Sequence, residues 1–171
     1  MSLRMTFLAV AGFSALILGS AWFAQYVLDM APCGLCMRQR IGHYFAIPLG
    51  LISAWALSMR STGGKASVLV FAIAIVIAVG HSMYWAGFHI GVEQKWWEGL
   101  ASCNSGAAMN ATLEELLNTP FAACDVPTII FKWFFGGLSM ATVHLLTLLP
   151  LMALALFAAY QTIKGQNFLA R

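Results

Sequence analysis

Two cysteines separated by two residues, Cys33 and Cys36, carry the strongest chemical signal in this sequence of 171 residues. Sulfurs at this spacing can close a small disulfide ring, and attack by a thiolate can open it again. A nearby cation favours the reactive thiolate form of a cysteine. Arg40, four residues past Cys36, is placed to be that cation. The run therefore predicts thiol redox chemistry.

Other uses of this cysteine pair can be weighed from its neighbours. Attachment of a c-type haem needs His directly after the second cysteine, and Met37 stands there. A four-cysteine zinc site needs a second Cys-x-x-Cys arm, but 20 residues separate Cys103 from Cys124. We therefore expect no metal centre. A purely structural disulfide remains open, although so small a ring suits exchange better than stapling.

The elements that position this pair are predicted to be membrane spans. Hydrophobic residues make up 61% of the sequence and charged residues 9%, against about 25% charged in soluble domains. Four segments lack Asp, Glu, Lys and Arg, and each has about the 20 residues that cross a bilayer. These segments are 5–28, 41–59, 66–92 and 137–160. We expect an all-α, integral membrane four-helix bundle, a single domain over 1–171 with spans at about 5–28, 41–59, 66–88 and 137–160.

The first of these segments also has the flanks of a cleaved signal peptide. Arg4 precedes it, and small residues occupy 19–21. The apolar core of a signal peptide is only about 7 to 15 residues long, whereas this apolar run continues to Leu28. We therefore expect an uncleaved span.

Charge predicts the orientation of the bundle. Four spans put both termini and the turn 60–65 on one side, and the outer loops 29–40 and 93–132 on the other. All six acids fall in the outer loops. The basic residues on the first side are Arg4, Arg60, Lys65, Lys164 and Arg171. The positive-inside bias makes that side cytoplasmic, and a net charge of +3 explained by topology does not indicate nucleic-acid binding.

All four cysteines then lie on the non-cytoplasmic side, where disulfides persist. Cys103 and Cys124 bracket a stretch with many small and polar residues. Taken alone, this pair suits a structural staple worth about 3 to 4 kcal/mol from loop closure. Two disulfides within reach of each other can also pass electrons by thiolate exchange. Both interpretations remain open on spacing alone.

Local signals locate helix starts around these loops. We expect the second helix to begin at the cysteine pair with Pro32 in its first turn, since that turn does not need the missing N–H. Cys36 would then lie where backbone N–H groups favour a thiolate, with Arg40 on the same face. In the long outer loop, Thr112 and Glu115 predict a capping box and a short helix ending near Pro120. Trp96 and Trp97 suit the headgroup level of a membrane.

Three features together resemble the disulfide bond formation protein B (DsbB) family. They are Pro32-Cys33-x-x-Cys36-x-x-x-Arg40 opening the second span, the paired cysteines of the outer loop, and Phe135-Gly136-Gly137-Leu138-Ser139-Met140 opening the fourth. The resemblance covers nearly the whole chain. It implies a quinone-dependent thiol:disulfide oxidoreductase of the bacterial inner membrane, with periplasmic cysteine loops. The implied partner is a periplasmic thioredoxin-fold thiol oxidase of the DsbA type, and the implied acceptor is ubiquinone or menaquinone.

The resemblance also implies a role for each cysteine. Electrons would pass from the partner to Cys103–Cys124, then to Cys33–Cys36, then to quinone. Cys103 looks like the sulfur attacked by the partner, and Cys124 like the one that attacks Cys33. Cys36 would face the quinone. Arg40 looks like the residue that stabilises both this thiolate and the reduced quinone oxygen.

The histidines divide between a possible site and the bundle interior. The segment 87–94 resembles a family segment near the quinone, so His89 or Glu93 could bind it and handle its protons. His89 could equally be an interfacial polar residue. His81 and His144 suit hydrogen bonds inside the bundle.

Two other functions remain as alternatives. The vitamin K epoxide reductase family also places Cys-x-x-Cys near a quinone, but typically at the start of the last helix of its bundle. A structural or assembly membrane protein would use its disulfides only to hold the outer loop. Reduction of added quinone at the expense of a dithiol would separate an enzyme from a structural protein.

Overall fold

A computed structural model describes residues 2–59, 64–100, 123–127, 129–131 and 137–169 of the chain. These residues form four long helices, as the sequence predicts: α1 (Leu3–Tyr26), α2 (Gly34–Ala56), α3 (Gly64–Glu93) and α6 (Met140–Leu169). Two short strands, β1 (Ile129–Phe131) and β2 (Leu138–Ser139), pair antiparallel just before α6. The short helix predicted near 112–120 lies outside the described residues.

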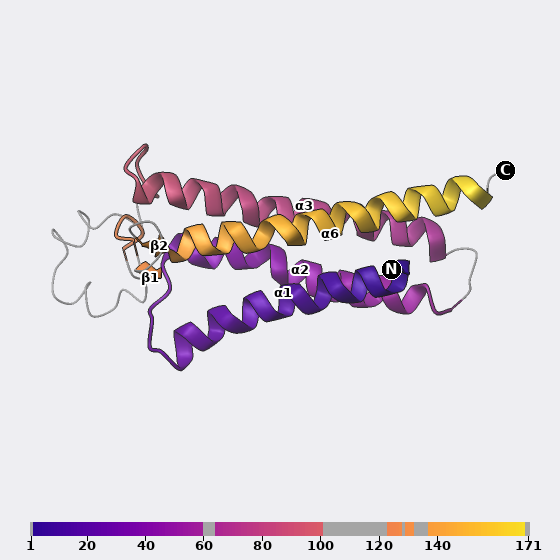
Figure 1. Cartoon of the computed structure of the whole chain (residues 1–171), viewed down its shortest axis with the longest axis horizontal. Helices are drawn as coiled ribbons and strands as arrows, with labels where there is room; N and C mark the ends of the chain where they lie inside the picture. The colour runs from indigo at the N-terminus through magenta and orange to yellow at the C-terminus, as the bar shows by residue number, and fades with distance from the viewer. Residues whose placement is uncertain (1, 60–63, 101–122, 128, 132–136, 170–171) are drawn as a thin grey trace.

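The four helices run antiparallel to their neighbours in one bundle (Figure 1). α2 packs against α1 and α3, and α6 packs against α3 and α1, so each helix has two neighbours. Both termini lie at one end of the bundle, and the strands and the start of α2 lie at the other (Figure 1). The termini and the start of α2, with its cysteine pair, therefore lie at opposite ends of the bundle, as a chain with four spans requires.

Three of the helices, α1, α3 and α6, are long and apolar enough to cross a membrane. α2 falls short among the described helices because its first turns carry Arg38, Gln39 and Arg40. Large apolar side chains point outward from the bundle, including Leu16 at 72% exposed and Ile77 at 66%. A helix that is apolar on its outer face as well as its inner one suits lipid on the outside.

Small residues let α2 approach its neighbours closely. Gly42, Ala46, Gly50 and Ala54 recur every four residues, and all are buried. A Cβ on Gly42 would lie 2.9 Å from the Ala78 carbonyl carbon of α3. A Cβ on Gly50 would lie 3.0 Å from the carbonyl oxygen of Phe7 in α1. Small residues at such contacts are a general device of membrane helix packing.

Candidate functional site

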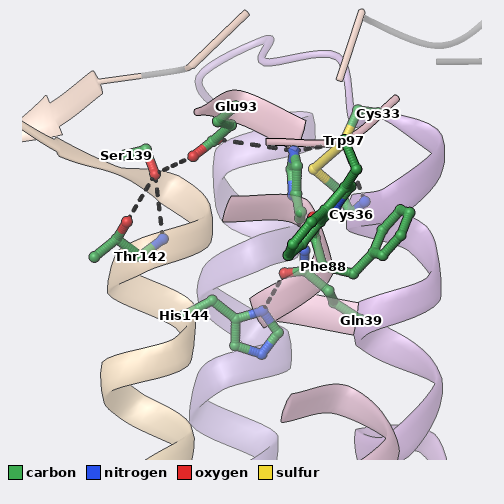
Figure 2. Close-up of polar contacts among 10 residues, drawn as sticks. Cys33, Cys36, Gln39, Phe88, Glu93, Trp97, Ser139, Thr142 and His144 are labelled. Atoms are coloured by element: carbon green, nitrogen blue, oxygen red, sulfur yellow. Dashed lines mark hydrogen bonds and ion pairs between the residues drawn. A yellow bond between two sulfur atoms is a disulfide. The ribbon is translucent and has the colours of Figure 1, made fainter. Parts of the chain in front are cut away.

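The site begins at the start of α2, where Cys33 caps the helix. Its backbone is extended, and its Sγ accepts a hydrogen bond from the N–H of Cys36 at 3.0 Å. α2 therefore starts at Gly34, and the prediction that Pro32 lies in the first turn is wrong. Cys36 does lie in that turn, and a disulfide joins it to Cys33 (Figure 2). The helix N–H is directed at the sulfur of Cys33, not at that of Cys36.

The end of α3 brings a second group of side chains to the same place. Lys95 adopts a left-handed backbone with φ of 58°. Its N–H donates to the Val92 carbonyl at 3.0 Å, and the N–H of Trp96 donates to the Gly91 carbonyl at 2.9 Å. This pair of bonds is a Schellman motif, which ends the helix at Glu93. His89 and Glu93 therefore occupy the last turns of α3.

The start of α6 is tied to the end of α3 through Ser139. Its Oγ accepts from the Thr142 N–H at 3.2 Å, as a helix cap does, and donates to Oε2 of Glu93 at 2.5 Å (Figure 2). Ser139 and Glu93 are both buried. The carboxylate thus has a defined orientation, with its other oxygen, Oε1, 3.8 Å from Nε2 of His89.

His89 joins the two cysteine regions. Its Nε2 lies 3.8 Å from Sγ of Cys33, and its side chain is hydrogen-bonded with the backbone of Cys124. Cys33, Leu35, Val92 and Cys124 pack together in one buried cluster. Cys124 is itself disulfide-bonded, whereas Cys103, its predicted partner, lies outside the described residues. The fold therefore places a sulfur of the outer-loop pair beside the Cys-x-x-Cys pair.

A chain of polar side chains runs from His89 into the bundle. Gln39 Nε2 donates to Nδ1 of His89 at 2.8 Å, and Gln39 Oε1 accepts from Nδ1 of His144 at 2.7 Å. Nε2 of His144 lies 3.1 Å from Nε2 of His43. In this orientation of the amide, the neutral His89 ring carries its proton on Nε2, facing Cys33. Figure 2 shows Gln39 reaching across from α2 to His144 on α6.

Arg40 points toward α1. Its Nη1 donates to Oε1 of Gln25 at 2.6 Å, and its Nη2 donates to the Ala21 carbonyl at 3.4 Å. The side chain is only 5% exposed. A guanidinium has five N–H donors, and within the described part of the chain these two bonds leave three for another group. The hydrogen bonds of Arg40 thus hold α1, and Cys36 is not among their acceptors.

One cavity of about 560 Å³ is lined by Cys33, Cys36 and most of the polar groups around them. It lies between α1, α2, α3 and α6, and its walls include apolar side chains of α1. Its polar lining consists largely of Cys33, Cys36, Gln39, Arg40, His43, His89, Glu93 and His144. Such a mixture, an apolar cavity with a few converging polar groups, is typical of a small-molecule site.

Comparison with known proteins identifies the family. The family described as disulfide bond formation protein DsbB matches residues 3–158. This chain belongs to the DsbB family. A disulfide bond formation protein B from Hahella chejuensis is 30% identical over 161 residues, which cover 89% of this chain and 88% of the relative. Disulfide bond formation protein B 1 from Pseudomonas putida is 36% identical over 80 residues, covering 46% of this chain and 48% of that protein. No solved structure gave a significant match.

Membership of the DsbB family makes this a membrane protein with an oxidoreductase role in disulfide formation. Five of the predicted site residues that the structure describes line the cavity: Cys33, Cys36, Arg40, His89 and Glu93. Cys124 lies in the buried cluster beside Cys33, and Cys103 lies outside the described residues.

Three polar residues that line or support this cavity were not predicted from the sequence, and two histidines make the hydrogen bonds that were predicted for them. Gln39 and His43 were not singled out, and Ser139 appeared only as part of a motif. A polar residue in a predicted span, such as His43, is itself a signal of function or pairing. His144 is hydrogen-bonded inside the bundle as predicted, and His81 likewise accepts from Trp85 Nε1 at 2.9 Å.

Proposed function

We propose that this DsbB family protein oxidises a periplasmic thioredoxin-fold thiol oxidase of the DsbA type and passes the electrons to a membrane quinone. The observation that carries this proposal is the single cavity that Cys36 and Arg40 share with His89 and Glu93. A disulfide with a purely structural role has no need of such a cavity.

The cavity suits a quinone in size and chemistry. Small-molecule sites commonly measure about 300 to 1,000 Å³, and this one measures about 560 Å³. Ile17, Leu18 and Phe23 of α1 line it with apolar surface. The three N–H donors of Arg40 left by its bonds to α1 can bind a carbonyl oxygen. A bound quinone would supply the acceptor for two electrons.

The side chains of the site divide the remaining work. Once the Cys33–Cys36 disulfide is reduced, the charge of Arg40 in the same cavity favours a thiolate at Cys36. His89 Nε2 is close enough to Cys33 to hold or return a thiol proton through a small movement. Gln39 holds the opposite nitrogen of His89, and Ser139 holds Glu93, so both proton-handling groups have fixed orientations.

The electron path into this site would begin at the outer-loop cysteines. The partner dithiol attacks Cys103, the Cys103–Cys124 bond breaks, and the partner leaves as a disulfide. The Cys124 thiolate then attacks Cys33 and displaces Cys36. Attack of the Cys103 thiolate on Cys124 reforms the outer pair and releases Cys33, which leaves Cys33 and Cys36 reduced. Packing of Cys124 in the same cluster as Cys33 supports this transfer. Two electrons and two protons pass at each stage.

The proposal includes the setting of the protein. The chain would form a single domain in the bacterial inner membrane, and α2 would cross the membrane together with α1, α3 and α6. Both termini would be cytoplasmic and the cysteine loops periplasmic. The sorting of acids to the outer loops supports this orientation.

The test is an assay of the purified protein in detergent with a reduced DsbA-type protein and added quinone. We expect quinol to form with one partner disulfide made for each quinol. Cys33→Ser and Cys36→Ser should each abolish it, and His81→Ala, a change outside the cavity, should not. A purified, folded protein that reduces no quinone with this dithiol would contradict the proposal and favour a structural role.

A further inference from the structure

Metal-binding atoms of three kinds converge where α2 begins. Sγ of Cys33, Sγ of Cys36 and a ring nitrogen of His89 all lie within 4.8 Å of one another. A carboxylate oxygen, Oε1 of Glu93, lies 3.8 Å from Nε2 of the same histidine. Thiolate, imidazole and carboxylate are the ligands that zinc takes in proteins.

The separations measured from His89 match those of a tetrahedral zinc site. Zinc binds sulfur at about 2.3 Å and nitrogen or carboxylate oxygen at about 2.0 to 2.2 Å, which places neighbouring ligand atoms about 3.4 to 3.8 Å apart. Nε2 of His89 lies 3.8 Å from Cys33 Sγ and 3.8 Å from Glu93 Oε1. The His89 ring is therefore already near ligand distance, whereas the Glu93 carboxylate lies outside the group of atoms within 4.8 Å of one another and must turn toward the sulfurs to bind.

We propose that reduction of the Cys33–Cys36 disulfide creates a zinc site with Cys33, Cys36, His89 and Glu93 as ligands. A disulfide carries no thiolate charge, so the oxidised protein lacks two of the four ligands. A dithiol or phosphine reductant gives two electrons, is oxidised itself, and leaves two thiols. Zn²⁺ then replaces their two protons and forms two Zn–S bonds. The site exists in one redox state only.

The residues behind these ligands are arranged as in zinc proteins. Metal-bound histidines are usually held through their other ring nitrogen, and metal-bound carboxylates are themselves hydrogen-bonded. Gln39 contacts Nδ1 of His89, and Ser139 donates to Oε2 of Glu93. Rotating the Gln39 amide by half a turn lets Oε1 accept from a protonated Nδ1 and keeps the contact with His144, which can either donate or accept. Nε2 of His89 then carries no proton, and its hydrogen bond with the Cys124 backbone must give way to the metal.

The charges in the cavity also balance. Zn²⁺ with two thiolates and one carboxylate has a net charge of −1, and Arg40 lines the same cavity. This ligand set differs from the four-cysteine site rejected from spacing, because half of it comes from α3.

A metal bound in this way would hold both sulfurs and leave no thiolate to pass electrons onward. Zinc in the outer compartment would therefore arrest the reduced protein. This consequence rests on the proposed function, whereas the metal site does not.

Titration with Co²⁺ tests the site directly. The full chain, with Cys103→Ser and Cys124→Ser to remove competing thiols, is reduced with a phosphine, freed of reductant without oxygen, and titrated in detergent. We expect one Co²⁺ per chain with the visible spectrum of a tetrahedral, sulfur-ligated ion, and displacement by Zn²⁺. The oxidised protein should give no such spectrum. An octahedral spectrum, or none in the reduced protein, would overturn the site.

Substitutions in α3 distinguish a metal ion held by all four ligands from one held by the two thiolates alone. His89→Ala and Glu93→Gln should each weaken Co²⁺ binding by at least about tenfold, and His81→Ala, a matched change in α3, should not. Unchanged affinity in both ligand variants would overturn the proposal. Thermal unfolding of the oxidised variants checks that each is folded. If His89→Ala does not fold, Co²⁺ binding by the near-isosteric Glu93→Gln variant decides whether α3 supplies ligands.

An activity measurement separates the metal site from the proposed function. In the wild-type assay, Zn²⁺ should stop quinone reduction and a chelator should restore it. If the protein binds Co²⁺ but Zn²⁺ does not inhibit quinone reduction, the proposal that bound metal stops electron transfer would be overturned. A protein that reduces no quinone even without zinc would refute the proposed function, and the Co²⁺ titration would still decide the metal site.

Discussion

Arg40 shows how one side chain can serve both the fold and the site. Its hydrogen bonds to Gln25 and Ala21 tie α2 to α1, although both helices also pack elsewhere. The guanidinium nevertheless keeps three donors and lines the cavity with Cys36. A role in binding the acceptor and a role in holding α1 can therefore be separated by experiment.

Arg40→Ala should lower quinone reduction by about 10- to 100-fold, because a hydrogen bond to a charged group contributes about 1.5 to 3 kcal/mol. Lys should restore only part of the activity, since it keeps the charge but lacks paired planar donors. Steady-state rates across quinone concentrations measure this. A raised KM indicates ground-state binding, and a lowered kcat indicates stabilisation of the reduced oxygen.

Gln25→Ala is the control, because it removes the bond to α1 and keeps the guanidinium. Normal kinetics in Arg40→Ala would refute the assigned role. An equal loss in both variants would assign Arg40 to the fold.

The outer-loop cysteines make a second prediction at the scale of residues. Cys124→Ser should accumulate a mixed disulfide between Cys103 and the periplasmic partner, because the free Cys103 thiol attacks the disulfide of the oxidised partner and no Cys124 thiolate remains to displace the partner. Non-reducing electrophoresis of cells expressing the variant measures the adduct. Cys103→Ser should give none. Equal amounts in the two variants would contradict the assigned order of attack.

At the scale of elements, α2 depends on having small residues where it meets α1 and α3. A side chain at Gly42 would run into the backbone carbonyl of Ala78 and into Ser82. The hydroxyl of Ser82 donates to the carbonyl of Gln39 at 2.7 Å, so the same contact supports the residue that orients His89. Helix packing and site geometry are therefore coupled here.

Gly42→Ala should destabilise the protein by about 1 to 3 kcal/mol, because the backbone of α3 must move away. Gly12→Ala in α1 is the matched control, since a Cβ there meets nothing within 4 Å. It should leave stability unchanged or raise it by up to about 1 kcal/mol. Unfolding of both variants in detergent measures the difference. Equal stability would show that α2 and α3 do not pack as closely as described.

At the scale of the whole molecule, the two ends of the bundle differ in chemistry. The end with the strands also carries Cys33, Cys36 and Cys124, with the exposed Glu98 five residues past the end of α3, and the opposite end carries both termini. Lys164 is exposed on the last turns of α6 near the C-terminus. These two positions can report orientation better than the native cysteines, because Cys33 and Cys124 are buried.

In a background with all four cysteines replaced by Ser, Glu98→Cys should react with a membrane-impermeant thiol reagent in intact spheroplasts. Lys164→Cys should react only after the membrane is permeabilised. The expectation follows from the positive-inside bias of this chain. The reverse pattern of labelling would invert the topology and with it the periplasmic site.

Much of this protein was predictable from local patterns. Hydropathy indicated four helices, and all four are present, with α3 running on to Glu93 because its end is set by backbone bonds. The Cys-x-x-Cys spacing and Arg40 one turn later indicated the site, because residues three or four apart in a helix share a face. Such patterns do not locate the start of a helix to within one residue. They therefore did not predict that Cys33 caps α2, and Pro32 was wrongly placed inside the first turn.

Sequence by itself determined the membrane class of this chain, its helices, its family resemblance and its redox cysteines, because these depend on composition and on spacings within one helix turn. Only the tertiary structure decided which side chains meet. Gln39 bonds residues 50 and 105 positions away, and Glu93 bonds one 46 positions away. Such pairs form when close packing at small residues brings three helices together, and no local period records that packing.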